Sequence, residues 1–281
     1  MCANILSFTL LKAEQNHDIM GVELGRNGLS FTHLFFVDDS LLFFRNNAKS
    51  LATLRTTLEW YCILSGQKNN LDKSDLFCSP NMSREDQESL ASQLQVNFVV
   101  NPSKYLGVNF KLRERWVADF HYLVEKLQSK LQGRKAKLLS QAGRTTLISS
   151  VLQSMPLYTF SCFRVPDTVY DKPNATTRAF WWGYDPGTRK LHLINWNEVC
   201  KPRREGGLGL KKFKLMNQAM LAKQFWGIAY NPQSLLARTL KGKYYPRGSI
   251  HDCSPKPHNS WIWRNIIKSK KILNLRKVNG G

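Results

Sequence analysis

The 281-residue sequence has few acidic side chains in its second half. Residues 113–281 carry 31 Lys and Arg but only 9 Asp and Glu, whereas residues 1–112 carry 10 basic and 11 acidic side chains. The chain as a whole has a formal net charge of +21. A surplus of this size favours polyanions as partners, with nucleic acid ahead of a membrane surface.

Cysteines and long apolar runs are also scarce. The six cysteines are scattered without a C-x-x-C pair, which excludes a disulfide scaffold and indicates reduced, intracellular thiols. Their spacing to histidines predicts no zinc site. The longest apolar run, at 34–44, is interrupted by Asp38 and Asp39 and is too short to cross a membrane. The N-terminal segment lacks the basic start and cleavage signature of a secretory signal, so we expect a soluble protein.

Two aromatic-rich runs at 30–44 (SFTHLFFVDDSLLFF) predict a buried β-hairpin with Asp38 and Asp39 at its turn. Phe and Leu side chains frame the two acids, so we expect both carboxylates to be partly desolvated. Adjacent carboxylates repel each other unless a cation or a basic partner neutralises them. The hairpin is therefore the first candidate for a cation-binding site.

Apolar periodicity and capping residues predict further elements on both sides of a boundary near 110–116. In the first region we expect helices at 47–66 and 82–95, the latter capped by Ser83, and strands at 75–78 and 104–110. The second of these strands contains Gly107, which lets the backbone turn or approach a neighbour closely. In the second region we expect helices at 116–133, 140–156, 177–182, 213–230 and 260–273. The fold class that this predicts is α+β, with a mixed region at 1–112 and a mostly helical, basic region at 113–281.

Three strings follow one another along the first region: FVDD at 36–39, SGQKNNLDKS at 65–74 and KYLGV at 104–108. In this order they resemble the reverse transcriptases of non-LTR retrotransposons, especially the long-interspersed-element proteins of plants. FVDD at 36–39 resembles that family's motif C, SGQKNNLDKS at 65–74 its motif D, and KYLGV at 104–108 the strand and turn at the end of the palm. LLSQAGRTTLISSVLQSMPLY (138–158) and INWNEVCKPRREGGLGLKKF (194–213) resemble its thumb and connector. The resemblance covers nearly the whole chain. It implies a partial reverse-transcriptase palm, an antiparallel sheet with helices, followed by a basic helical thumb and connector.

The resemblance implies that the parent enzyme is an RNA-directed DNA polymerase, which uses Mg²⁺ and deoxynucleotides on an RNA template and a DNA primer. Asp38 would be the main metal ligand and Asp39 an accessory one. Lys73, or less favourably Lys68, would stabilise charge or donate a proton near the departing pyrophosphate. Tyr105 would help to hold the primer end. A solvated turn lysine and an edge-strand tyrosine are the alternative interpretations of the last two.

The sequence also departs from the family pattern. Val37 stands where the family has Ala, and Pro173 would interrupt a helix. The fingers and the motif A strand, with its further catalytic aspartate, are not matched, because Glu14, Asp18 and Glu23 lie in polar contexts without such a strand. We therefore expect a fragment that binds Mg²⁺ weakly and does not polymerise alone.

Basic residues of the second region are expected to track a phosphate backbone, as a polymerase thumb requires. The candidates are Lys126, Lys130, Arg134, Lys135, Lys137, Arg203 and Arg204. Six tryptophans, at 181, 182, 196, 226, 261 and 263, are interpreted as thumb core rather than as base-stacking platforms. The Gly-rich string at 206–209 is interpreted as a tight turn, because it lacks the spacing of a phosphate-binding loop.

Other functions stay open. A non-catalytic nucleic-acid-binding module would bind RNA or DNA strongly and with steep salt dependence, and substitutions at Asp38 and Asp39 would not affect this binding. A maturase-type splicing factor would bind intron RNA specifically. The reading frame could also be a relic without a selected role. An element of this kind works on nuclear DNA, so the nucleus is expected ahead of an organelle.

Overall fold

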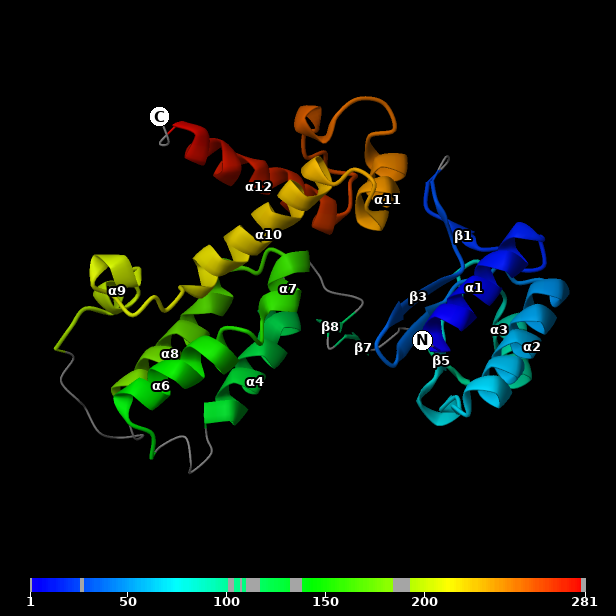
Figure 1. The fold of residues 1–281 in the computed structure, drawn as a ribbon, viewed down its shortest axis with the longest axis horizontal. Helices are drawn as coiled ribbons and strands as arrows, with labels where there is room; N and C mark the ends of the chain where they lie inside the picture. The colour runs from blue at the N-terminus through cyan, green and yellow to red at the C-terminus, as the bar shows by residue number, and fades with distance from the viewer. Residues whose placement is uncertain are drawn as a thin grey trace. The chain divides into compact units, whose positions relative to one another are not determined.

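The computed structural model describes residues 2–25, 28–100, 104–106, 108–109, 117–131, 138–183 and 193–278 (Figure 1). The chain divides into two compact units: unit 1 is Met1–Lys111 with Gln233–Gly248, and unit 2 is Leu112–Pro232 with Ser249–Gly281. Residues 233–248, which the charge pattern grouped with the second region, thus belong to unit 1. The α+β class expected from the sequence is confirmed.

Unit 1 combines helices with short strand pairs. Its helices are α1 (Cys2–Gln15), α2 (Ala48–Ser65), α3 (Arg84–Leu94) and α11 (Leu235–Tyr244), with a 3₁₀ turn η1 (Leu71–Lys73). Three described pairs are antiparallel, namely β1 (Val22–Glu23) with β2 (Ser30–Phe31), β3 (His33–Phe36) with β4 (Asp39–Leu42), and β7 (Lys104–Tyr105) with β8 (Val108–Asn109). A parallel pair joins β5 (Asp75–Leu76) to β6 (Asn97–Phe98). The described strands therefore form separate pairs rather than one antiparallel sheet.

The core of unit 1 lies between α1, α2 and the β3–β4 hairpin. Leu6 and Leu10, one turn apart on α1, are buried against Leu54 of α2. Phe35 and Leu42 of the hairpin pack against this cluster. Full burial of such a side chain contributes roughly 1.5–3 kcal/mol, so this small cluster fixes the hairpin to the two helices.

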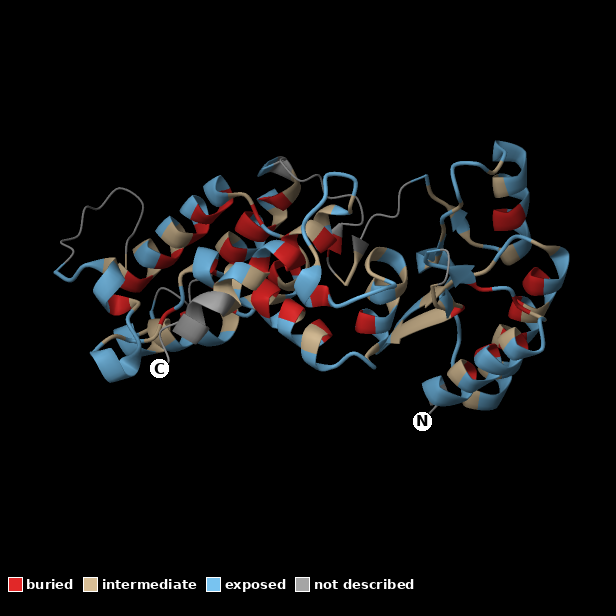
Figure 2. Ribbon diagram, turned by 90° about the horizontal axis from the view of Figure 1, so that it is seen from above, coloured by how far each residue is buried: buried red, intermediate tan, exposed pale blue. Residues whose placement is uncertain are grey.

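Unit 2 is helical in its described residues. Its α-helices are α4 (His121–Leu131), α6 (Gln141–Leu147), α7 (Leu157–Cys162), α8 (Asp171–Trp182), α9 (Trp196–Val199), α10 (Phe213–Tyr230) and α12 (Trp261–Val278). Shorter turns are η2 (Val117–Phe120), the π-helical η3 (Ile148–Leu152), η4 (Asp167–Tyr170), η5 (Arg203–Glu205) and η6 (Ile250–Asp252). Helix α10 packs against both α7 and α12. Buried positions follow the inner faces of these helices, and their outer faces are exposed (Figure 2).

Local sequence signals placed several elements correctly. Helix α10 has the expected bounds, and the Ser83 side chain accepts a hydrogen bond from the Asp86 N–H at the start of α3. Strand residues lie near both ends of the segment expected at 104–110, as β7 and β8, and these two strands pair with each other as a short hairpin with Leu106 at a φ of 50°. Helices α1 and α11 were not expected. A cap for α11 was nevertheless present in Ser234, whose side chain accepts from the Ala237 N–H.

The expected helix break at Pro173 is also wrong. Pro173 lies in the first turn of α8, which runs without interruption from Asp171 to Trp182. The first N–H groups of a helix have no intrahelical acceptor, so a proline there removes no hydrogen bond. The Pro173 ring is instead buried among neighbouring apolar side chains of unit 2.

None of the helices in the described part of the chain is both long enough and apolar enough to cross a bilayer.

Candidate functional site

The β3–β4 hairpin presents two carboxylates at its tip. Phe36 pairs with Asp39, which leaves Val37 and Asp38 as a two-residue turn. Asp38 thus lies in the turn, and Asp39 is the first residue of β4. Val37 has a φ of 54°, a left-handed conformation that is unfavourable for a β-branched residue. A short turn of this kind fixes the spacing of the two acids along the backbone.

The expectation that these carboxylates are desolvated is wrong, because Asp38 and Asp39 are both exposed. Successive side chains of a strand point to opposite faces, and the face of the hairpin that carries Phe35 and Leu42 packs on the core. The tip extends past that core, since Val37 is 87% exposed. The two charges are therefore hydrated and open to a ligand.

A second hairpin lies close to the first. Tyr105 is in β7, and its pKa is raised by burial and then by the negative charge of Asp39. This interaction brings together two of the residues that the sequence singled out. Val108 of β8 is buried. The β3–β4 tip and the β7–β8 hairpin together form what we call the carboxylate site, defined by Asp38, Asp39 and Tyr105.

Lys73 is not joined to the carboxylate site. It closes η1, where its N–H donates to the Asn70 side chain, and η1 packs against β6. In the described residues no hydrogen bond or ion pair links Lys73 to Asp38 or Asp39. The Lys73 and Lys68 side chains are both exposed.

The described acids do not form a complete two-metal centre. Within the described ranges no group of three or more His, Cys, Asp or Glu side chains is placed to hold a metal ion. The acids of the N-terminal segment are engaged elsewhere: Asp18 pairs with Lys49 at 2.9 Å and Glu23 with Arg45 at 3.8 Å. Carboxylate oxygens suit Mg²⁺, but two adjacent acids supply only part of the ligands that two ions require.

The basic candidates occupy exposed positions in unit 2. Lys126 and Lys130 lie on the outer face of α4, opposite the buried Leu123 and Leu127, and the Lys126 ammonium is 5.7 Å from the Tyr122 ring centre. Arg203 and Arg204 lie exposed in η5. The other three candidates, Arg134, Lys135 and Lys137, lie outside the described residues.

The interpretation of the string at 206–209 as a tight turn is confirmed. Gly206 has a φ of 82° and Gly209 a φ of 72°. A Cβ on Gly207 would lie 2.1 Å from the Lys201 carbonyl oxygen, so only glycine fits this approach.

Five of the six tryptophans belong to the core, as expected. Trp181 and Trp263 are buried, and the others that pack against the main cluster of unit 2 are Trp182, Trp196 and Trp261. Trp226 is the exception, because half of it is exposed. It stacks on Tyr230, with ring centres 3.9 Å apart and planes inclined by 21°.

A polar cluster in unit 1 was not expected. The two ring nitrogens of His33 form hydrogen bonds with hydroxyls, Nε2 with Ser7 at 2.7 Å and Nδ1 with Thr32 at 2.9 Å. Burial lowers the His33 pKa, and the charge of Glu14 partly opposes this. Sequence alone gives no signal for the cluster, since Ser7 and His33 are 26 residues apart. It joins α1 to the base of the hairpin.

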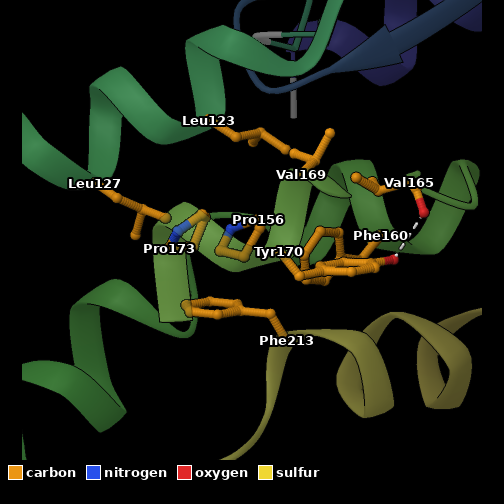
Figure 3. Close-up of a pocket in the computed structure, with 9 residues that line it drawn as sticks. All are labelled: Leu123, Leu127, Pro156, Phe160, Val165, Val169, Tyr170, Pro173 and Phe213. Atoms are coloured by element: carbon orange, nitrogen blue, oxygen red, sulfur yellow. Dashed lines mark hydrogen bonds between the residues drawn. The ribbon is translucent and has the colours of Figure 1, made fainter. Parts of the chain in front are cut away.

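A small cavity lies inside unit 2 (Figure 3). Its lining is apolar and includes Leu123, Phe160, Pro173 and Phe213. Its volume is about 10 Å³, which is at the lower limit for one water molecule. It is a small packing gap in the core rather than a substrate pocket.

The fold and the site together describe an α+β protein with two adjacent acids at a hairpin tip and a basic, helical second unit. No protein-family profile matches the chain. It is 37% identical over 150 residues to the Arabidopsis thaliana protein named "Putative ribonuclease H protein At1g65750", a match covering 52% of this chain and 24% of that relative. It is also 35% identical over 132 residues, or 46% of this chain, to the Arabidopsis thaliana "Uncharacterized mitochondrial protein AtMg00310". Because that match spans 86% of the latter, the chain belongs to the same family as this mitochondrial protein.

Proposed function

We propose that the chain is part of the RNA-directed DNA polymerase of a non-LTR retrotransposon. Unit 1 would contribute the carboxylate hairpin and the primer-end hairpin of the palm. Unit 2 would contribute the thumb and connector. The name of the first relative, a ribonuclease H protein, agrees with an element that handles RNA and DNA together.

The carboxylate site carries this proposal. A reverse transcriptase must hold a primer terminus beside metal-binding acids, and Tyr105 lies near enough to Asp39 for the aspartate charge to affect its pKa. Bound Mg²⁺ would activate the primer hydroxyl and stabilise the leaving pyrophosphate. The protein residues would hold the reactants in place. Asp38 and Asp39 would supply oxygen ligands from a short turn, and Tyr105 would contact the primer end. Such a polymerase needs a further carboxylate, and the described residues offer none beside the pair.

The chain alone is therefore expected to show no polymerase activity. The test is primer extension on an RNA template with Mg²⁺ or Mn²⁺, comparing the wild-type chain with an Asp38→Ala, Asp39→Ala variant. Equal, background-level incorporation by both supports the proposal. Extension by the wild-type chain that the double variant loses would show that the two acids suffice.

A second candidate function is a non-catalytic nucleic-acid-binding module. It is favoured by the charge of unit 2, whose sequence carries 27 basic and 9 acidic side chains. Contacts to phosphates release counterions, so the affinity for labelled RNA should fall steeply as salt rises. The measurement is a fluorescence-anisotropy titration at several salt concentrations, with a Lys126→Gln, Lys130→Gln variant that should give a shallower salt slope.

The two candidates differ at the carboxylate site. A binding module predicts the same RNA affinity for the wild-type chain and the Asp38→Ala, Asp39→Ala variant, with and without Mg²⁺. A polymerase part predicts that Mg²⁺ strengthens binding of a primer–template only when the two acids are present.

The nuclear location expected for such an element also remains a proposal. The second relative is named as mitochondrial, which makes the organelle the specific alternative. Imaging of the tagged full chain in plant cells distinguishes the two, because a mitochondrial signal would contradict the nuclear assignment.

A further inference from the structure

Trp226 and Tyr230 form a stacked pair on the outer face of α10. The two residues are one helical turn apart, and their rings are 3.9 Å apart with an inclination of 21°. Trp226 remains 50% exposed and Tyr230 60% exposed. The buried face of the same helix carries other residues, such as Phe225 and Ile228. The pair is thus not part of the core of unit 2.

The helix is open at Gly227, beside the pair, and the neighbouring sequence carries no acidic residue. A Cβ added to Gly227, between the two rings along the chain, would meet no atom within 4 Å. Lys223 is exposed three residues before Trp226, on the same side of the helix. No Asp or Glu occurs anywhere between residues 206 and 251, a stretch that carries eight Lys and Arg. This composition suits an anionic ligand that also has flat apolar groups.

We propose that the Trp226–Tyr230 pair is a base-stacking platform for unpaired nucleotides of a single-stranded nucleic acid. This rests on the proposed function to the extent that unit 2 binds nucleic acid. Stacking on an aromatic ring is tolerant of sequence, because every base has a π-face. The two rings already support each other in one orientation, so a base that extends the stack immobilises few additional bonds. Lys223 would contact a phosphate of the same strand.

The platform differs in kind from the phosphate-tracking lysines. Phosphate contacts depend on salt and are indifferent to the presence of a base. Stacking depends on the base and releases few counterions. The two contributions can therefore be separated by a ligand that keeps the phosphates and lacks the bases.

The experiment compares two fluorescent strands of equal length and charge, an oligothymidylate and its abasic counterpart. The wild-type full chain should bind the oligothymidylate more tightly. Trp226→Leu and Tyr230→Leu should each weaken that binding about five-fold or more, with little change in the abasic affinity and an unchanged salt slope. Trp226→Phe should keep most of the affinity because it keeps a ring. Leu215→Ala, which alters another exposed residue of α10, is the matched control and should bind as the wild type does.

A measurement without substitution complements the variants. A strand carrying 5-iodouracil, irradiated in complex with the wild-type chain, should crosslink within residues 223–230. Crosslinks confined to other segments would overturn the platform. So would Leu variants that bind both strands as the wild type does, which would assign the exposed pair to a protein contact instead.

The outcomes also separate this inference from the proposed function. If the wild-type chain binds neither strand, nucleic-acid binding itself fails. If it binds both strands equally and the Leu variants change nothing, unit 2 binds phosphates and only the platform is wrong.

Discussion

Asn217 connects three segments of unit 2 through a single amide group. Its Oδ1 accepts hydrogen bonds from the Val165 N–H at 3.1 Å and from the Tyr170 hydroxyl at 2.7 Å. Its Nδ2 donates to the carbonyls of Phe160 and Phe163, both at 2.8 Å. The side chain is 1% exposed, so water cannot replace these partners. Asn217 therefore fixes how α10 meets the end of α7 and the turn that follows.

Asn217→Ala should destabilise unit 2 by about 2–4 kcal/mol, because it leaves buried donors and acceptors without partners. Urea unfolding followed by tryptophan fluorescence measures the change. The control is Gln218→Ala, which removes the neighbouring amide outside this network and should cost less than about 1 kcal/mol. Similar losses for the two variants would contradict the role assigned to Asn217.

His33 should make the stability of unit 1 depend on pH. Its pKa is lowered in the folded chain from the usual 6.5, chiefly by burial, so the unfolded chain takes up a proton more readily. The stabilisation is therefore present above about pH 6.5 and is lost as the pH falls through the lower, folded value. Thermal unfolding between pH 8 and pH 5 should show this decline. It should be reduced in His33→Gln, whereas the change of an exposed histidine, His258→Gln, should leave it intact.

Whether a residue's role can be predicted from the sequence depends on how far along the chain its hydrogen-bond partners lie. The caps Ser83 and Ser140 could be predicted, because each accepts from an N–H three residues ahead. The roles of Asn217 and His33 could not, since the Asn217 partners lie 47 or more residues away and Ser7, which links His33 to α1, lies 26 residues away. Asp38 and Asp39 were identified because they are adjacent acids between two apolar runs and because FVDD resembles motif C. Their exposure, by contrast, depends on how the hairpin meets α1 and α2.

The β3–β4 hairpin contains backbone strain at its tip. Val37 adopts a φ of 54°, which costs a β-branched residue of order 1–3 kcal/mol. Val37→Gly should therefore stabilise unit 1 by about 1 kcal/mol, the gain being offset in part by the greater freedom of glycine in the unfolded chain. Chemical denaturation followed by circular dichroism measures it.

Val100→Gly is the matched control for this prediction, because Val100 is exposed and has no positive φ. That variant should be neutral or slightly destabilised. A loss of stability in Val37→Gly equal to that of the control would show that the tip is not strained.

Helices with strong local sequence signals were predictable, whereas the way in which short strands pair with each other was not. Helix α10 has a continuous apolar face and was expected with its true bounds. The β7–β8 hairpin is built from two-residue strands, too short for an alternating pattern to reveal the reversal between them. The exposure of Trp226 was not predictable either. Helical spacing places Trp226 on α10, but it does not show which face of the helix other elements bury.

At the scale of the whole molecule, the two units differ in charge and in their fluorescent residues. Unit 2 has a sequence charge of +18 and unit 1 of +3. Seven of the eight tryptophans fall within the sequence ranges of unit 2, and Trp60 is the one in unit 1. Tryptophan fluorescence therefore reports mainly on unit 2, whereas far-ultraviolet circular dichroism reports on both.

We expect two unfolding transitions, because compact units with separate cores need not unfold together. Circular dichroism should detect both, and fluorescence mainly one. Asn217→Ala should shift the transition that fluorescence detects, and Val37→Gly the other. A single transition that both substitutions move equally would show that the units unfold as one.

The discontinuity of unit 1 has a consequence for how the chain is made. Residues 233–248 complete this unit, and Gly25 lies against residues of α11, since a Cβ on Gly25 would be 3.2 Å from the Gly242 carbonyl oxygen. A ribosome releases this segment only after 121 residues of unit 2, 112–232, have been synthesised. Unit 1 therefore cannot complete its fold until most of unit 2 has been synthesised. A nascent polypeptide stalled before residue 233 would carry a first unit that is more easily digested by protease than the same unit in the released protein.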